Sequence, residues 1–362
     1  MQSLDRDFSL IEQSIARGIE FLQRHQLDYG EFSTYIGSEA ELKESPVAFD
    51  SSCFVTSLIT HSLSYVSHPA VDGMVSRASD FLVSEMEGAG LWRYYSSRNF
   101  KRTRVSPDLD DTSCVSYVLR RCGRDIPPNE KTFLTHQNKQ GVFLVWIMRR
   151  PRLLLRNPAL YLALRAIEKT ANAVKPPMPE EQRGNPRFCE EVDWVPPEEI
   201  DPAVNANVIL YLGENDSTAA AIRYIVELIE SGKEGDVYSY YSSPLAIYYM
   251  VSRAHLHSSP SLGEAGPTIV ERLAELQCED GSFGVALLTG VAASTLLTFA
   301  PGNPALDAAI QNIVDSQARD GSWPRHAFYN GPVEHWGSAE LTTGFCLEAL
   351  ARYKDAHAAK GN

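Results

Sequence analysis

The chain has 362 residues, of which 44% are hydrophobic and 22% are charged, as in globular proteins with a sizeable core. Its formal net charge of −13 argues against nucleic acid as a partner, because that role needs clustered positive charge. The six cysteines include no Cys-x-x-Cys pair. This argues against a disulfide framework and a structural zinc site, and favours a reducing, cytoplasmic location.

The first predicted element is an amphipathic helix, with Ile11, Ile15 and Ile19 on one face and charged residues on the other. The residues before it are acidic and lack an apolar run, so no secretory leader is expected. A membrane-spanning helix needs about 20 consecutive apolar residues. The chain contains no such run, and none is expected.

A short unit then recurs along the chain: a helix end, a Gln, an Asp-Gly turn and an aromatic residue. Glycine supplies the positive φ of the tight turn, and the aromatic residue is expected to anchor it. Clear copies lie at residues 21–32, 276–283 and 316–323, and weaker ones at 88–92 and 137–143.

After each turn, a loop leads to a second helix that is apolar on nearly every side, as buried helices are. Most of these helices begin with Asp or Ser, which are good N-caps; they start near residues 49–53, 109–113, 200–204, 240–244, 284–294 and 336–340. Six outer–inner pairs fit the length. The sequence therefore predicts an all-α fold, a single (α/α)6 toroid over residues 1–362, with a basic apolar insertion around 142–190. The alternative is an open solenoid, but the inner helices are too apolar to face water.

Asp108-Leu109-Asp110-Asp111-Thr112-Ser113 opens the second inner helix. Three carboxylates within four residues cannot all stay ionised in a half-buried site, so at least one should hold a proton at neutral pH. A protonated carboxyl aimed at a cavity is a general acid. The alternative is that these residues only cap the helix, although a cap needs one Asp and three are present.

The Gln-x-x-Asp-Gly-Ser-Trp/Phe turns and the Asp-x-Asp-Asp-Thr-Ser motif together resemble those of class II terpene cyclases, the relatives of squalene–hopene cyclase. The resemblance implies that Asp110 protonates a terminal isoprenoid alkene or epoxide, supported by Asp108 and Asp111. With room for one toroid, the chain is most similar to the monodomain, merosterolic acid synthase-like cyclases. These convert a linear prenyl chain attached to an aromatic acid into a polycyclic meroterpenoid. No cofactor is implied, and Mg²⁺ would be needed only with a diphosphate substrate.

The same resemblance implies a hydrogen-bond partner for the acid on the next inner helix. Asp201 is interpreted as the repeat counterpart of Asp110, and Asn205 lies four residues later on the same face. Asn205 is therefore predicted to orient the acid. Asn207, about 160° away around the helix, is the fallback. Both could instead be core amides that bind neighbouring loops.

A growing carbocation is stabilised by aromatic faces, each worth about 2 kcal/mol when desolvated. The preferred substrate-binding residues are Trp92, Tyr95, Tyr240, Tyr241, Trp336 and His335. Four further candidates lie on similar loops: Tyr94, Trp194, Tyr238 and Phe283. An aromatic residue that belongs to a turn unit can be a structural anchor instead. The final proton acceptor is left open between His335 and a bound water.

Residues 142–165 contain five Arg and no acid in an otherwise apolar stretch. Three interpretations stay open: a peripheral membrane contact, a receptor for a substrate carboxylate, or an insertion with solvated Arg. A hydrophobic prenylated small molecule is the expected partner.

Three other classes of protein are alternatives. Protein prenyltransferase β subunits share the α/α toroid but need clustered zinc ligands, and no nearby His pairs with Cys53 or Cys114. A class I ionising synthase needs an Asp-Asp-x-x-Asp motif, which Asp110-Asp111-Thr112-Ser113-Cys114 does not complete. A non-catalytic isoprenoid carrier on the same scaffold is the third alternative.

Overall fold

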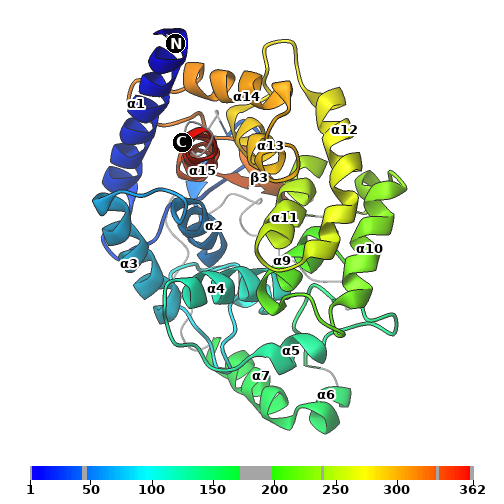
Figure 1. The fold of residues 1–362 in the computed structure, drawn as a ribbon. Helices are drawn as coiled ribbons and strands as arrows, with labels where there is room; N and C mark the ends of the chain where they lie inside the picture. Colours follow the sequence, from blue (N-terminus) through cyan, green and yellow to red (C-terminus); the bar gives the residue numbers. More distant parts are fainter. Residues whose placement is uncertain are drawn as a thin grey trace.

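The computed structural model describes residues 2–42, 47–149, 151–171, 198–237, 240–331 and 334–358, which are mostly helical. Six buried helices form an inner layer, and each contacts the next along the chain (Figure 1). The last one also contacts the first, so the layer closes into a ring. The inner helices are α2 (Cys53–Leu63), α4 (Leu109–Arg121), α9 (Pro202–Leu212), α11 (Pro244–His257), α13 (Ala286–Phe299) and α15 (Ala339–Ala358).

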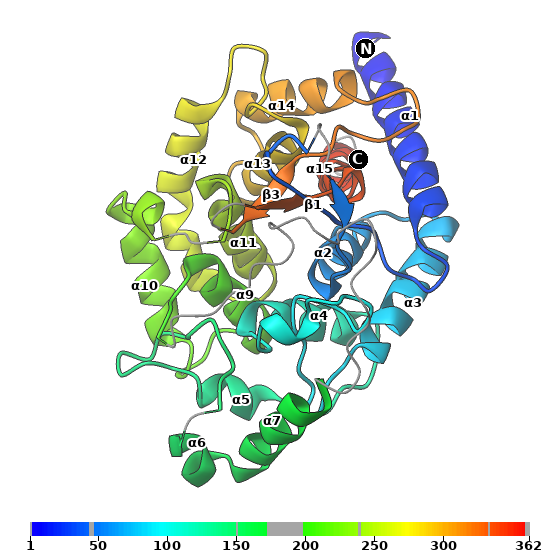
Figure 2. The same cartoon turned by 180° about the vertical axis from the view of Figure 1, so that it is seen from behind.

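Outer helices precede the inner ones in the chain and surround them (Figures 1 and 2). They are α1 (Gln2–His25), α3 (Pro69–Ser84), α5 (Glu130–Leu134), α10 (Ala219–Glu230), α12 (Gly266–Leu276) and α14 (Pro304–Asp315). Short 3₁₀ turns are η1 (Arg102–Arg104), η3 (Glu234–Asp236) and η4 (Pro260–Ala265). Helices α6 (Pro151–Arg156) and α7 (Pro158–Ala171) lie beside α5, outside the ring.

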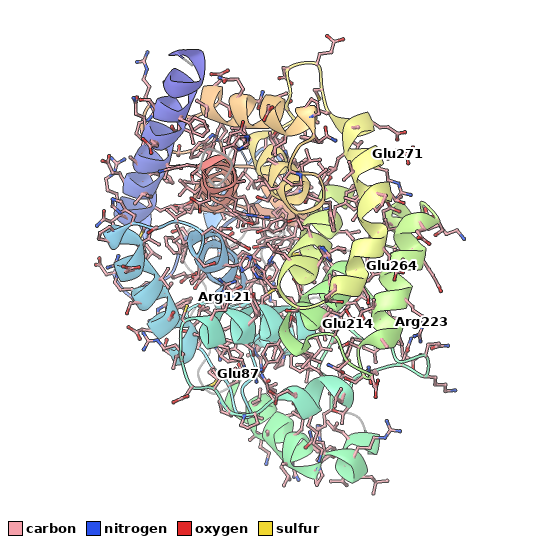
Figure 3. The ribbon with its side chains drawn as sticks, viewed as in Figure 1. Glu87, Arg121, Glu214, Arg223, Glu264 and Glu271 are labelled. Carbon is pink, nitrogen blue, oxygen red and sulfur yellow. The ribbon has the colours of Figure 1, made fainter. Side chains whose placement is uncertain are left out.

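The two layers follow from the hydrophobic pattern. Residues 202–211 of α9 are all buried, whereas α10 buries one apolar stripe and exposes the opposite side, as its spacing predicts. The charges therefore lie outside: Arg223, Glu264 and Glu271 are exposed and point outward from the outer layer (Figure 3).

The recurring turns hold neighbouring outer helices together. In each of four turns, one Gln amide donates to two backbone oxygens, one in its own turn and one in or just before the next outer helix. The pairs of acceptors are Gly30 and Met74 for Gln26, Gly141 and Ser217 for Gln137, Gly281 and Ala305 for Gln277, and Gly321 and Ser14 for Gln317. The last pair joins the turn after α14 to α1, so it closes the outer layer.

Glycine is required at these turns for two reasons. Gly30 and Gly321 have φ of +102° and +93°, which L side chains rarely adopt. A Cβ at Gly321 would also lie 2.3 Å from the backbone oxygen of Arg17 in α1. The turn thus brings two backbones closer than any side chain would allow.

The expectation of a purely helical chain needs one correction, because the structure contains a small antiparallel sheet. Its order is β2 (Ala48–Phe49), β1 (Tyr35–Gly37), β4 (His335–Gly337) and β3 (Ala327–Asn330). These strands are two to four residues long, too short for a period-two pattern to be recognised. The sheet joins the loops before α2 and α15, so the first and last repeats also meet there.

Among the described residues, no helix is long and apolar enough to cross a membrane.

We predict that Gln317→Ala lowers the free energy of unfolding by about 1–3 kcal/mol, because two backbone oxygens lose their donor. Urea titration measures this loss. The matched control is Gln311→Ala, an exposed residue whose amide binds only Asp315 locally, with an expected change within about 0.5 kcal/mol. Equal stability of the two variants would contradict the role of the Gln turns.

Candidate active site

Asp108 is the N-cap of α4. Its backbone is extended, and its Oδ1 accepts the Asp111 N–H at 2.7 Å. The simple capping function of the motif is therefore carried by its first acid. Asp110 and Asp111 lie in the first turn of the helix, where the positive end of the helix dipole stabilises negative charge.

Asp110 joins three segments that are far apart in the sequence. Asn207 Nδ2, from α9, donates to Asp110 Oδ1 at 2.7 Å, and the Tyr241 hydroxyl, just before α11, donates to Oδ2 at 2.6 Å. Burial raises the pKa of Asp110, and these two hydrogen bonds oppose the rise. Each carboxyl oxygen has a second lone pair, so the group can carry a proton while keeping both partners.

Asp111 and Asp108 form a coupled pair behind Asp110. Their carboxyl groups share a hydrogen bond. Burial and the neighbouring Asp108 charge raise the pKa of Asp111 well above its usual range, so Asp111 keeps a proton and donates it to Asp108. Both are buried, whereas part of the Asp110 residue surface stays accessible. Of the three acids, Asp110 is therefore the one that can reach a bound molecule.

The structure corrects the prediction for Asn205. Its amide accepts the N–H of Phe143 and donates to the backbone oxygens of Phe143 and Asp201, so it does not contact Asp110. In four other repeats, a Thr takes this place and accepts the N–H of the turn aromatic: Thr56, Thr112, Thr289 and Thr343. Asn205 is thus a structural residue of the repeat, and the fallback residue Asn207 meets the acid.

The cause is a shift of two residues in the repeat register. Asp201 caps α9 as Asp108 caps α4. The repeat counterpart of Asp201 is therefore Asp108, and not Asp110. Counting from the cap shows that Asn205 matches Thr112.

A group of aromatic side chains lies beside the acid. Tyr241 packs edge-on against Phe328, and Tyr329 stacks on Trp336 with ring centroids 6.1 Å apart. The hydroxyl groups of Tyr94 and Tyr329 are hydrogen bonded to each other at 2.9 Å. Because each of these hydroxyls has a protein partner, the group presents mainly aromatic surface.

The other predicted aromatic residues differ in what they contact. Trp92 is fully buried and its indole N–H donates to the Leu82 oxygen, as Trp323 does to Ile313; it is a turn anchor, and the substrate-binding prediction for it is wrong. Tyr95 packs edge-on against Tyr94. Tyr240 packs against Trp146, and both donate to Glu199 Oε2.

Trp336 and His335 lie in β4, and the Trp336 indole donates to Asp50 at 2.7 Å. Phe283, from the turn before α13, is buried, and its backbone N–H donates a hydrogen bond to the Thr289 hydroxyl. Trp194 and Tyr238 lie outside the described residues.

Sequence reasoning missed Tyr329 and did not select Tyr94. Tyr329 comes from β3, in a loop with no motif, and its only signal was two adjacent aromatic residues before an inner helix. Tyr94 was a candidate, but its neighbour Tyr95 was preferred without any feature that separates the two.

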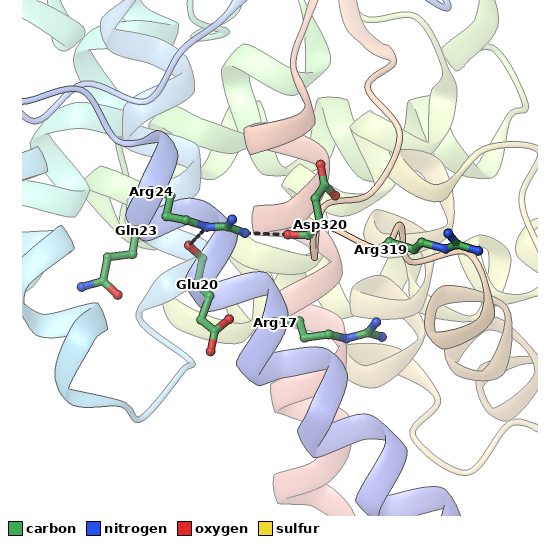
Figure 4. Close-up of a pocket in the computed structure, with 6 residues that line it drawn as sticks. All are labelled: Arg17, Glu20, Gln23, Arg24, Arg319 and Asp320. Carbon is green, nitrogen blue, oxygen red and sulfur yellow. Dashed lines mark hydrogen bonds between the residues drawn. The ribbon is translucent and has the colours of Figure 1, made fainter.

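Two cavities differ in their relation to the acid. One of about 300 Å³ lies between the ring and α7, next to the motif, and is lined by Pro107, Ile147, Met148, Arg149 and Leu164, among others. Another of about 460 Å³ is a charged surface hollow between α1 and the turn after α14 (Figure 4). Its Arg24 is bound to the Asp320 oxygen, so this hollow belongs to the outer layer and not to the acid site. Among the residues that the structure describes, no three His, Cys, Asp or Glu side chains are grouped as metal ligands.

No protein-family model and no curated protein matches the sequence. Solved structures do match the fold. A protein from Actinoplanes is similar over 95% of this chain and 99% of its own, at 16% identity and a TM-score of 0.66. The type II terpene cyclase MstE from Scytonema, as a variant in complex with geranylgeranyl dihydroxybenzoate, is similar over 97% of this chain and 99% of its own. Its sequence identity is 13% and its TM-score is 0.63.

A third match, ent-copalyl diphosphate synthase from Streptomyces platensis, covers 83% of this chain and 50% of its own, at 16% identity and a TM-score of 0.52. At these identities the likeness shows the fold: this chain has the fold of these terpene cyclases.

We predict that Asp111→Asn flattens the pH dependence of stability. A carboxyl whose pKa is raised by folding stabilises the protein fully below its unfolded pKa of about 4, and this contribution is lost as pH rises through the raised value. The amide introduced by the substitution cannot ionise, and it can still donate to Asp108. The variant should therefore gain stability relative to the natural protein as pH rises from 4 to 8.

Thermal unfolding across that pH range measures the difference. The control Asp216→Asn is exposed and should run parallel to the natural protein. A parallel curve for Asp111→Asn as well would show that Asp111 is not held protonated.

Proposed function

We propose that this chain is a class II, protonation-initiated terpene cyclase built as a single (α/α)6 toroid over residues 1–362, with an insertion around 142–190. The observation that carries the proposal is the Asp110 carboxyl, which is held between Asn207 of α9 and Tyr241 from the loop before α11 and lies beside aromatic rings. The closed ring of inner helices and the fold shared with type II terpene cyclases support it.

The geometry suits proton transfer to a weak base. Asp110 is the accessible acid, and burial raises its pKa, which favours the protonated form that a proton donor needs. When its proton moves to a terminal alkene carbon, the carboxylate left behind keeps the hydrogen bonds from Asn207 and Tyr241. Asp111, whose pKa is raised well above its usual range, stays protonated, so the pair that it forms with Asp108 carries one negative charge instead of two beside the new carboxylate.

The aromatic group can stabilise the resulting carbocation. Rings of Tyr94, Tyr329 and Trp336 pack on one another, and each offers a face that attracts a cation. Their polar atoms are already bound, to each other or to Asp50, so they are poor nucleophiles. Tyr240, Tyr241, Tyr95 and His335 complete the proposed substrate-binding set.

The proposed substrate is a prenyl chain attached to an aromatic acid, and the product a polycyclic meroterpenoid. The support is the fold shared with MstE, a variant of which is in complex with geranylgeranyl dihydroxybenzoate. Protonation of an alkene needs no cofactor; Mg²⁺ would be needed only with a diphosphate substrate.

Two alternatives from other classes are less well supported. A zinc-dependent prenyltransferase-like enzyme needs a cluster of Asp, Cys and His ligands. The described residues contain none, and stoichiometric bound zinc would revive this alternative. A non-catalytic isoprenoid carrier has no need for an accessible acid with two dedicated hydrogen-bond donors.

We predict that Asp110→Asn reduces cyclisation by about 10²–10⁴-fold, the range for loss of a general acid, while substrate binding and fold are retained. Product analysis by mass spectrometry, with geranylgeranyl dihydroxybenzoate, geranylgeranyl diphosphate and squalene as a panel, measures this. The matched control Asp201→Asn changes another buried helix cap and should keep turnover per folded molecule. Cyclisation by Asp110→Asn would refute the acid assignment, and turnover of the diphosphate alone would refute the substrate class.

A prenylated substrate partitions into lipid, so a cytoplasmic enzyme that acts on it would need to contact a membrane surface. We propose that α6 and α7 make a peripheral contact with anionic membranes. Leu154, Leu155 and Leu162 are 50%, 88% and 59% exposed, and the exposed Arg156 and Arg165 lie on the same two helices. Exposed leucines beside arginines, in a chain of net charge −13, suit an anionic lipid surface.

We predict that the double variant Leu155→Ser and Leu162→Ser binds anionic phosphatidylserine vesicles several-fold more weakly than the natural protein, because it loses buried apolar area. Co-sedimentation at low and high salt measures this. Leu276→Ser is the control, since Leu276 is 47% exposed on α12, away from α6 and α7. Equal sedimentation of all three proteins would exclude the contact.

A further inference from the structure

A buried positive charge without a carboxylate partner lies inside the ring. Arg253 of α11 is 1% exposed, and its Nη1 donates to the sulfur of Met250 at 3.0 Å. Its Nε and Nη2 have no hydrogen-bond partner, and no carboxylate of the described residues forms an ion pair with it. A charge buried in this way is costly unless something compensates it.

This charge lies on the inner side of α4, near the acid. Asp110, Cys114 and Tyr117 are spaced at i, i+4 and i+7, which places them on one face of α4. The Arg253 charge acts on both the Cys114 thiol and the Asp110 carboxyl, and it opposes the rise in the pKa of each that burial causes. Cys114 lies about one helical turn from Asp110 along this face, so the guanidinium acts on the acid from the side of the ring on which Cys114 lies.

The other acid near Arg253 is already paired. Glu348 of α15 is bound to Arg352 at 3.2 Å and accepts hydrogen bonds from Ser62 and Tyr249. Its charge also acts on Arg253, but Glu348 shares that charge with Arg352 and forms no ion pair with Arg253. Ionisation of Asp110, on which the Arg253 charge also acts, would add a further negative charge near the guanidinium.

The remaining titratable groups around Arg253 carry no negative charge at neutral pH. His61 of α2 and His257 of α11 are kept neutral, since burial and the Arg charges lower their pKa, that of His257 to about 4. Burial raises the pKa of the Cys114 thiol and of the Tyr249 and Tyr65 hydroxyls. The facing groups are Cys114, Tyr117 and Arg121 on α4, His61 and Tyr65 at α2, Tyr249 and His257 on α11, and Glu348 and Arg352 on α15.

We infer that Arg253 is a positioning residue for the proton donor: its buried guanidinium compensates the Asp110 carboxylate that forms when the proton is transferred. The inference rests on the proposed function. In the step, the O–H bond of Asp110 breaks and the alkene π pair forms the new C–H bond. The O–H electron pair stays on the carboxylate, and the charge of the substrate rises by one unit, located on the prenyl chain as a carbocation. The proton lost by the final cation goes to water, and water protonates Asp110 again.

This arrangement makes Asp110 a stronger acid without ionising it early. Burial favours the protonated form, whereas the fixed positive charge of Arg253 favours the carboxylate only.

The test compares Arg253→Met, Arg253→Lys and the control Arg121→Met, in which an exposed Arg on the same face of α4 is removed. For Arg253→Met we expect turnover to fall about tenfold or more. The pH at which the rate falls on the alkaline side should rise by about one unit, because the Asp110 carboxylate loses one nearby positive charge. Arg253→Lys should recover most of both, and Arg121→Met should match the natural protein.

Stability gives an independent readout. Since Arg253 has no ion-pair partner among the described residues, Arg253→Met should melt at the same temperature as the natural protein or higher. A lower melting temperature with an unchanged pH profile in the folded fraction would show a structural role and overturn the inference. If Arg253→Met does not fold, Arg253→Gln removes the charge and is judged by the same shift in the pH profile. Cyclisation by Asp110→Asn would refute the proposed function itself, whereas an unchanged pH profile in the Arg253 variants refutes only this inference.

Discussion

The closed ring of inner helices is the constraint on which the site depends, because it brings helix N-termini from distant repeats to one end of the molecule. Asp110 is 97 residues from Asn207 and 131 from Tyr241, and no local structure could hold the three together. The ring in turn depends on the outer turns, where a single Gln amide joins neighbouring outer helices. The last of these bonds spans 303 residues and closes the chain on α1. A small backbone contact on the outside therefore sets the positions of polar groups inside.

The three acids of the motif have separate functions, which their positions in the first turn of α4 explain. The first caps the helix and accepts hydrogen bonds from the backbone N–H and the carboxyl group of the third, so these two acids are paired with each other within the core. The second points to other inner helices and keeps an accessible surface. Crowding alone would raise the pKa of all three acids. The hydrogen-bond pattern decides that one is held as a donor and that the other two form a buried pair that shares one proton.

The recurring turn was predictable because it is a local unit: its Gly, its Gln and its aromatic residue act within a few residues of one another, and the same spacing returns. The motif itself was recognisable for the same reason. The assignment of Trp92 failed although its turn was recognised as a weak copy, since the sequence does not say whether an aromatic residue before an inner helix packs outward or faces the acid. In the structure its indole is bound to the end of α3, as the equivalent Trp323 is bound to the end of α14.

By itself, the sequence determined the helical repeats, their inner and outer faces, and the acid motif at the start of the second inner helix, because hydrophobic period and turn chemistry act locally. Only the tertiary structure decided that Asn207 and not Asn205 meets Asp110, and that Tyr241, Tyr94 and Tyr329 lie beside it. The choice depends on a two-residue register between repeats and on loops that end in short strands. A buried Arg253 without a carboxylate partner among the described residues was equally invisible, because its environment is made by side chains from several helices that become neighbours only when the ring closes.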